Sequence, residues 1–489
     1  MKIYSQNLSP VASSGAKWNA VSMLGNLILS MAQISLLTNY LLPEDFGVVA
    51  LLLVFISILT VFVSVGFSDV LIVKSEATDV QLSTMFWLNI IMGMCVYLIL
   101  FLVSPLVKNF IDHSDVEIIF QVMGLTILIG SLCVQFRTLM RRNLLFKELA
   151  IIDLIAHFCS FVIVIILLRN GYGIWALIIS SICTQMVALF FLYYYAFIYK
   201  WLPGFIFKIK EVKELIKFGS NRIAASLLGD VYSRVDQLTI GALLGPTALG
   251  IYSIAFNFSM QPFLKINPIL TQMSFPLFSI IKNDKEKLLS GYRKGLRILM
   301  FINSPVLLGM FAVAPLFIPI FLGPGWEDVV LIFQILCLYG LARSAGNINT
   351  GLVLSQEKYT WPTYWNLFLL FVIPITILTS VQIDESLVFV TYAVMLAQLI
   401  ILIASYFLFP RRLLGKFGIQ FIDDVGRPII ISSIMSFLVI LLDKNISFNS
   451  QLLELMFLVL FGVVIYVSMS YVCQRRNLKD LVEIILSKG

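Results

Sequence analysis

The sequence has little charge for its length. Asp, Glu, Lys and Arg make up 12% of the 489 residues, whereas hydrophobic residues make up 60%. Soluble domains carry about 25% charged residues and an apolar share near one half. Because a soluble core of this length cannot hide so much apolar surface, composition predicts a polytopic membrane protein.

Several patterns that carry chemistry are missing from the sequence. There are only two His, and no H-E-x-x-H, C-x-x-C or G-x-x-x-x-G-K-[ST] occurs. The six Cys lie in or at the ends of apolar stretches, which is typical of small core residues and not of disulfides or metal ligands. We therefore expect no catalytic residue, no metal site, no cofactor and no ATP motor. The first apolar stretch, 18–42, is too long for the core of a cleavable signal peptide.

Long apolar stretches are abundant, and about 20 such residues are needed to cross a bilayer as a helix. We predict fourteen transmembrane helices in an all-α fold. They cover residues 18–42, 47–67, 84–107, 116–137, 149–168, 173–198, 217–244, 247–275, 298–321, 327–354, 360–381, 387–409, 427–442 and 452–472.

The Lys and Arg residues orient these spans. With both termini in the cytoplasm, 28 of the 34 basic residues fall on the cytoplasmic side and three on the outer side. The outer turns are short and acidic, such as "PEDF" and "GWED". The net charge of +7 is then explained by basic loops that face anionic lipid head groups, so no nucleic-acid partner is expected.

The same outer corner occurs twice. "YLLPEDFGVVALLLVF" at 40–55 and "ALLGPTALGIYSIAFNF" at 242–258 both contain an apolar run, a Pro-containing break, a Gly and a second apolar run. Six spans separate the copies, so both halves enter the membrane in the same direction. This predicts two six-helix lobes related by a pseudo-twofold axis along the membrane normal, with a cleft between them. The predicted parts are 1–199, a linker at 200–214, a second lobe at 215–409, and two extra helices with a tail at 410–489.

Charges within a span cost roughly 3 kcal/mol each on insertion scales, so each needs a role. Arg234 lies about 15 Å from the outer turn at the helical rise, near the centre of the bilayer. Asp230 lies one turn away on the same face. Arg234 therefore either forms a structural pair with Asp230 or lines a cavity and contacts an anionic substrate, and we take the cavity as the working hypothesis.

Other polar stripes point to the same cavity. Asn257, Gln261 and Lys265 follow strict i,i+4 spacing, although Lys265 is deep enough to snorkel to the cytoplasmic interface instead. The predicted cavity lining is Asn26, Gln33, Asp230, Arg234, Gln237, Asn257, Gln261, Lys265, Arg343 and Asn347. A cleft with amides on one wall and cations on the other suits a sugar joined to a phosphate.

Three further residues are candidates for coupling to a proton or Na⁺. Asp153 and His157 form an i,i+4 pair near the inner face, and imidazole titrates near neutral pH. A plain hydrogen-bonded helix contact is the alternative for this pair. Asp236 lies on a different face from Asp230 and is the third candidate.

The chain resembles the Wzx-type polysaccharide flippases, in the colanic-acid and teichuronic-acid exporter branch of the multidrug/oligosaccharidyl-lipid/polysaccharide exporter superfamily. The resemblance rests on six segments that follow one another along the chain in this order: "LLPEDFGVVALLLVF", "GFSDVLIVK", "QFRTLMRRNLLFKELAIID", "GYGIWALIISSICTQ", "FGSNRIAASLLGDVYSRVDQLTIGALLGPTALGIYSIAFNF" and "FLGPGWEDVVLIFQILCLYGL". It implies a flippase of the bacterial inner membrane that moves an undecaprenyl-diphosphate-linked oligosaccharide to the outer leaflet. It further implies that Arg234, Lys265 and Arg343 lie in a cationic cavity. The polysaccharide polymerase and chain-length machinery are candidate partners.

Three alternatives remain open at this point. A drug/cation antiporter and a peptidoglycan lipid-precursor flippase share the expected fold. An antiporter favours acidic sites in the first half, where Asp153 is the one acid that lies inside a span beyond its first turn. A membrane polysaccharide polymerase would need a sizeable outer loop with catalytic residues, and every predicted outer loop is short. We therefore expect a transporter and not an enzyme.

Overall fold

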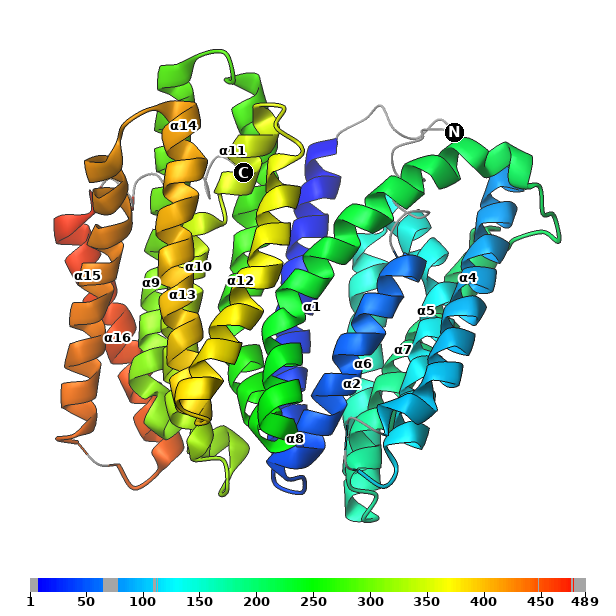
Figure 1. Cartoon of the computed structure of the whole chain (residues 1–489), viewed down its shortest axis with the longest axis horizontal. Coiled ribbons are helices and arrows are strands. Elements are labelled where there is room, and N and C mark those ends of the chain that lie inside the picture. Colours follow the sequence, from blue (N-terminus) through cyan, green and yellow to red (C-terminus); the bar gives the residue numbers. More distant parts are fainter. Residues whose placement is uncertain are drawn as a thin grey trace. The chain divides into compact units, whose positions relative to one another are not determined.

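The computed structural model describes residues 8–64, 78–108, 111, 113–446, 448–475 and 478. Every regular element in these ranges is a helix (Figure 1). The helices are α1 (Leu8–Thr38), α2 (Pro43–Ser64), α4 (Asp79–Val107), α5 (Val116–Arg142), α6 (Phe146–Arg169), α7 (Ile174–Ile198), η1 (Ile209–Val212), α8 (Lys213–Ile280), α9 (Lys285–Leu322), α10 (Asp328–Gly346), α11 (Asn349–Ser355), α12 (Trp361–Ile383), α13 (Leu387–Leu408), α14 (Pro410–Leu414), α15 (Gly418–Asp443) and α16 (Gln451–Cys473). The segment "GFSDVLIVK" and most of the C-terminal tail lie outside the described residues.

Thirteen helices in the described ranges are long and apolar enough to cross a membrane. One of them, α8, contains both predicted spans 217–244 and 247–275, and it is broken at Gly245, whose φ of 82° and ψ of 179° are not helical. Glycine adopts such a positive φ without the steric cost that a side chain would add. The break accounts for the difference between thirteen helices and fourteen predicted spans, and the all-α polytopic fold is confirmed.

Several helices extend beyond the apolar spans that define them in the sequence. The helix α9 begins at Lys285, well before the predicted start at 298, and the Asp284 carboxylate caps it by accepting the Lys287 N–H at 3.1 Å. The helix α5 likewise continues through Arg141 to Arg142. These additional turns are charged, so hydropathy alone does not include them in a membrane span.

Packing divides the chain into two units, which are Met1–Thr247 and Ala248–Gly489. The predicted lobe boundary at 200–214 stays a prediction. In the first unit α4 packs on α5, α5 on α7, and α6 on α7. In the second unit α9 packs on α10, α10 on α13, and α12 on α13. The three helix pairs correspond one to one in chain order, so packing within each unit supports the internal repeat that the doubled corner predicts.

The two extra C-terminal helices belong to the second unit. The helix α15 packs along α9 more extensively than any other pair of described helices, and α16 packs on both α15 and α9 (Figure 1). The buried contacts join Phe301 of α9 to Met435 of α15 and Tyr466 of α16, and the Tyr466 hydroxyl donates to the Phe301 carbonyl at 2.7 Å. These helices are therefore anchored through α9.

The first copy of the repeated corner lies against Pro246, which belongs to the second copy. In the first copy the Asp45 carboxylate accepts the Leu42 N–H at 3.0 Å, next to the start of α2. A Cβ atom built on Gly47 would lie 1.7 Å from the carbonyl oxygen of Pro246, which follows the break in α8. Gly47 is thus required by the close approach of another backbone segment in the first unit.

Candidate functional site

Ser22, Asn26 and Gln33 form a polar stripe along α1 in the first unit. The Gln33 amide donates to the Ser180 hydroxyl of α7 at 3.2 Å, and the Ser160 hydroxyl of α6 donates to the Ser180 carbonyl at 3.0 Å. Within α1, the Asn26 side-chain amide donates to the Ser22 hydroxyl one turn earlier, at 3.2 Å. The Asn26 Oδ1 atom is buried without a hydrogen-bond partner among the described residues. A buried acceptor without a partner costs about 1–3 kcal/mol.

Beside this stripe, the first unit contains a polar cavity of about 250 Å³. It is lined by Asn19 and Ser22 of α1, by Arg137 and Arg141 of α5, and by Phe146, Leu149, Ala150 and Asp153 of α6. Two guanidinium groups and one carboxylate give the lining a formal charge of +1. Such a lining presents amide and hydroxyl groups to neutral polar ligands and an excess of cation to an anion.

The central interaction of the cavity is an ion pair between two helices. The Arg137 Nη1 atom donates to Asp153 Oδ1 at 2.8 Å, and the two side chains are 28% and 31% exposed. His157 does not contact the Asp153 carboxylate through its ring Nδ1. That atom instead lies 2.9 Å from the Asp153 backbone carbonyl, which requires a proton on Nδ1. Asp153 and His157 are thus neighbours on one helix, whereas the charge partner of Asp153 comes from α5.

Of the charged residues that line this cavity, only Asp153 was predicted from the sequence as a site residue, whereas Arg137 and Arg141 were not. The helix α5 continues to Arg142 and carries Arg137 and Arg141 on one face. Their i,i+4 spacing was the available signal. Basic residues in the last turn of a helix also stabilise its C-terminal dipole, so the extension is locally favourable.

Four predicted residues lie on the part of α8 that belongs to the first unit. Asp230 and Arg234 are half-buried, and the Arg234 guanidinium is close enough to interact electrostatically with the Asp230 carboxylate. Asp236 and Gln237 are buried, and Asp236 Oδ1 accepts the Gln237 backbone N–H at 2.8 Å. The roles of all four in substrate binding or ion coupling remain predictions.

The other predicted residues belong to the second unit. On the later part of α8, Asn257 and Lys265 are exposed and Gln261 is half-buried. On α10, the Arg343 guanidinium lies 5.2 Å from the ring centroid of Phe263 and 5.9 Å from that of Tyr339.

Arg343 is therefore held by aromatic rings from two helices. Its Nη1 atom also donates to the Tyr339 hydroxyl at 3.2 Å. A guanidinium over aromatic faces keeps its charge while its orientation is restricted. Asn347 follows at the end of α10, where its backbone N–H donates to the Ser344 carbonyl.

Comparison with known proteins identifies the family. A family model described as polysaccharide biosynthesis protein matches residues 36–331, which is more than half of the chain. The chain belongs to this family. The resemblance to Wzx-type flippases that the sequence analysis noted is thereby confirmed.

Two relatives of this polysaccharide biosynthesis family member illustrate the match. The lipopolysaccharide biosynthesis protein WzxC of Escherichia coli (strain K12) is 28% identical over 424 residues, which cover 86% of this chain and 85% of WzxC. The teichuronic acid biosynthesis protein TuaB of Bacillus subtilis (strain 168) is 27% identical over 369 residues, covering 76% of each chain. The similarity therefore extends over most of both relatives.

Solved structures show the same fold in this family member. The lipid II flippase MurJ in an inward closed conformation matches with a TM-score of 0.71 at 16% identity, over 94% of this chain and 98% of MurJ. An inward-facing multidrug resistance transporter of the MATE family and the MOP superfamily matches with a TM-score of 0.63 at 13% identity, over 79% of this chain and 94% of that transporter. At these identities the likeness establishes the fold of a multi-pass membrane protein.

Proposed function

We propose that this protein moves an undecaprenyl-diphosphate-linked oligosaccharide across the inner membrane of a bacterium for the synthesis of a surface polysaccharide. Movement occurs by alternating access between two lobes, without covalent chemistry, and both chain termini lie in the cytoplasm. The polysaccharide polymerase and chain-length machinery act on the product. Family membership and the names of the two relatives support the pathway, and the MurJ fold supports the mode of action.

The structural observation that carries the proposal is the polar cavity around Arg137 and Arg141 in the first unit. A sugar cannot cross bare hydrocarbon, because each unpaired polar group costs several kcal/mol. Asn19 and Ser22 supply amide and hydroxyl partners for such a head group. A guanidinium forks onto phosphate oxygens and stays charged at all physiological pH values, which suits a diphosphate.

The ion pair offers a route for coupling. The Asp153 carboxylate accepts a hydrogen bond from Nη1 of Arg137 at 2.8 Å. A coupling cation that takes the place of Arg137 at this carboxylate frees the N–H group for a phosphate oxygen, so the cation and the anionic substrate favour each other's binding. Arg234, Lys265 and Arg343 provide further cations for the diphosphate as it passes, and Asp236 and His157 remain the other coupling candidates.

The proposal is tested with purified protein in proteoliposomes that contain a fluorescent lipid-linked oligosaccharide. Arg137→Ala and Arg234→Ala are each expected to weaken binding by about ten- to a hundredfold, because each removes a charge-assisted hydrogen bond. The Lys variants keep the charge and lose the fork, so they should recover only part of the activity. Arg169→Ala, at the exposed far end of α6, is the matched control.

Two outcomes would contradict the proposal. Wild-type transport by both Ala variants at normal protein levels would remove these arginines from the mechanism. Uptake of a cationic dye without movement of the lipid-linked sugar would instead favour the antiporter alternative.

A further inference from the structure

The segment 200–212, which connects α7 to α8 in the first unit, is held along the first turns of α4. The Trp87 indole N–H donates to the Gly204 carbonyl at 2.9 Å. The Gly204 backbone N–H donates in turn to the Ser83 hydroxyl, also at 2.9 Å. Side chains of α4 therefore satisfy backbone groups of the segment that no regular element pairs, which gives this connection a defined course.

The later part of the segment is fixed to α4 in the same way. The Lys208 backbone N–H donates to the Thr84 hydroxyl at 3.1 Å, and the Gln81 amide donates to the Glu211 carbonyl at 3.1 Å. Val212, at the end of η1, is fully buried. The segment is thus attached to α4 at several points along its length.

These contacts run from the apolar part of α4 toward its polar start. Gly204 contacts Trp87, which lies inside the predicted span 84–107, whereas Glu211 contacts Gln81, which lies before that span. The two contact points are about 9 Å apart along the helix at the helical rise. The beginning of the segment therefore lies at the depth of the hydrocarbon boundary, and its end lies nearer to water.

The middle of the segment exposes large apolar side chains. Phe205 is 95% exposed, and one face of its ring stacks against the ring of Trp87 at a centroid distance of 5.5 Å. Ile206, Phe207 and Ile209 are also exposed. A group of exposed apolar side chains on an ordered segment marks a contact with a membrane or another protein.

The same segment carries an excess of positive charge. Lys200, Lys208 and Lys210 are exposed, and Glu211 is the one acidic residue of 200–212. None of the three lysines has an ion-pair partner among the residues that the structure describes. Apolar groups at the hydrocarbon boundary, followed by lysines on the water side, are the arrangement that binds an anionic lipid surface.

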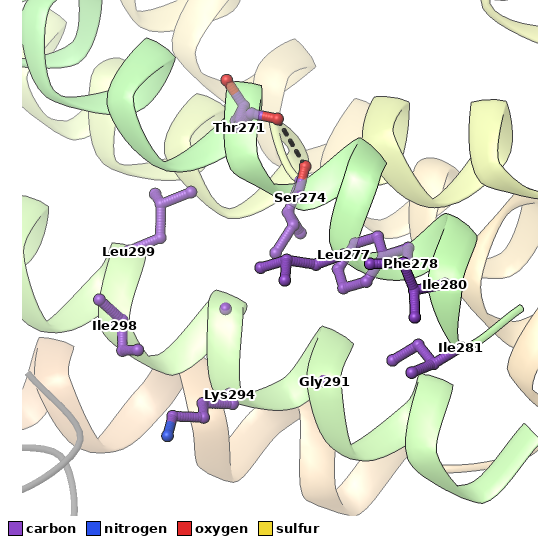
Figure 2. Close-up of a pocket in the computed structure, with 12 residues that line it drawn as sticks. Thr271, Ser274, Leu277, Phe278, Ile280, Ile281, Gly291, Lys294, Ile298 and Leu299 are labelled. Carbon is purple, nitrogen blue, oxygen red and sulfur yellow. Dashed lines mark hydrogen bonds between the residues drawn. The ribbon is translucent and has the colours of Figure 1, made fainter. Parts of the chain in front are cut away.

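Apolar surface without such charges does not select a ligand. A cavity of about 420 Å³ in the second unit, between the end of α8 and the start of α9, has a mostly apolar lining (Figure 2). Its Ser274 hydroxyl donates to the Thr271 carbonyl at 2.7 Å, and Lys294 at its border already interacts with another group of the protein. The segment 200–212 differs because its lysines are available to a partner.

We propose that segment 200–212 is a membrane-surface anchor that binds anionic glycerophospholipids in the leaflet beside the start of α4. Phe205 and Phe207 enter the boundary between acyl chains and head groups, and Lys208 and Lys210 pair with lipid phosphates. Attachment to lipid keeps the connection between α7 and α8 at the bilayer surface. The proposal is independent of the transport function.

The test measures hydrogen–deuterium exchange of residues 200–212 in the full-length protein, in nanodiscs of phosphatidylcholine with or without phosphatidylglycerol. These nanodiscs contain no undecaprenyl lipid, so protection does not depend on the transport substrate. Phosphatidylglycerol is expected to slow exchange across the segment. Lys208→Gln and Lys210→Gln should each reduce this protection by about fivefold, the value of one lysine near an anionic surface.

Two further variants separate lipid binding from misfolding. Phe205→Ser removes an almost fully exposed ring and should reduce protection by about tenfold, while the unfolding midpoint in detergent stays close to that of the wild type. Lys358→Gln, the matched control, removes an exposed lysine of the second unit and should exchange like the wild type.

Three results would each overturn the proposal. The first is equal exchange of the segment with and without phosphatidylglycerol. The second is exchange in Lys208→Gln and Lys210→Gln that matches the Lys358→Gln control. The third is protection that Phe205→Ser leaves unchanged, since the apolar side chain would then make no contact with lipid.

Discussion

The carboxylate of Asp424 on α15 accepts two hydrogen bonds from the guanidinium of Arg293 on α9, one from Nε at 2.6 Å and one from Nη2 at 3.1 Å. Arg297, one turn further along α9, donates to Asp424 Oδ1 at 3.3 Å. The Asp424 side chain is 1% exposed, and the two arginines are 23% and 13% exposed. This cluster joins the extra helices to the repeated part of the second unit.

Asp424→Asn should therefore destabilise the protein strongly. Removing one partner of a buried ion pair leaves uncompensated charge, which costs about 3–5 kcal/mol. Asp423→Asn is the matched control, because Asp423 pairs with Arg427 at the surface, where such a pair contributes at most about 1 kcal/mol. Denaturant unfolding in detergent measures both. Equal losses for the two variants would contradict the assignment of the buried cluster as the anchor.

Gly47→Ala should destabilise the first unit. The added Cβ would meet the Pro246 carbonyl oxygen at 1.7 Å, and overpacking of this kind costs about 1–3 kcal/mol or more. Gly130→Ala on α5 is the control, since a Cβ there meets no atom within 4 Å and Ala favours a helix. The measurement is the unfolding midpoint of each purified variant. A midpoint that falls for Gly130→Ala but not for Gly47→Ala would contradict the expectation.

The Arg137–Asp153 pair should show measurable coupling. A double-mutant cycle with Arg137→Gln and Asp153→Asn is expected to give about 1 kcal/mol, because both groups are partly exposed and screened by solvent. The same cycle with Arg169→Gln in place of Arg137→Gln should give none. Transport by the same variants separates structure from function. If each single variant loses transport, and the double variant regains stability but not transport, Arg137 has a role beyond structure.

Phe263 should be coupled to Arg343 through the contact of its ring with the guanidinium. The combination of Phe263→Leu with Arg343→Ala is expected to give a coupling free energy of about 0.5–1 kcal/mol. Phe258→Leu provides the comparison, since Phe258 is also buried on α8 but its ring contacts that of Phe317. Coupling of similar size at both positions would argue against a specific cation–aromatic contact.

The surface pair between Lys282 and Glu357 should give a small pH dependence. The Lys282 ammonium donates to Glu357 at 2.6 Å, which lowers the pKa of Glu357 below its usual 4.5 and raises the pKa of Lys282 above its usual 10.5. The contribution to stability is thus complete between these two values. It is lost as the pH falls through the lowered pKa of Glu357 or rises through the raised pKa of Lys282.

Glu357→Gln tests this pH dependence. The difference in unfolding midpoint between Glu357→Gln and the wild type should be constant from about pH 6 to 9 and should shrink in acid. The exposed Glu385→Gln is the control. A difference that persists unchanged well below pH 4.5 would exclude ionisation of Glu357 as its cause.

Sequence by itself determined the membrane class, the helical fold, the span positions and the family. The reason is physical: lipid offers no hydrogen-bond partners, so an apolar run of sufficient length must satisfy its backbone within a helix. The doubled corner likewise predicted a repeat, which the matching helix pairs of the two units support. The helices α9 and α5 extend past the predicted spans, to Lys285 and Arg142, because charged turns carry no hydropathy signal.

Only the tertiary structure decided which side chains meet. Periodicity places Asp153 and His157 on one helix, but the rotation and packing of α5 against α6 bring Arg137 to the carboxylate. The approach of Pro246 to Gly47, the ring of Phe263 over Arg343 and the apolar cavity beside Lys294 also depend on distant segments. Local sequence patterns fix the face of a helix, whereas contacts between helices depend on how several faces pack together.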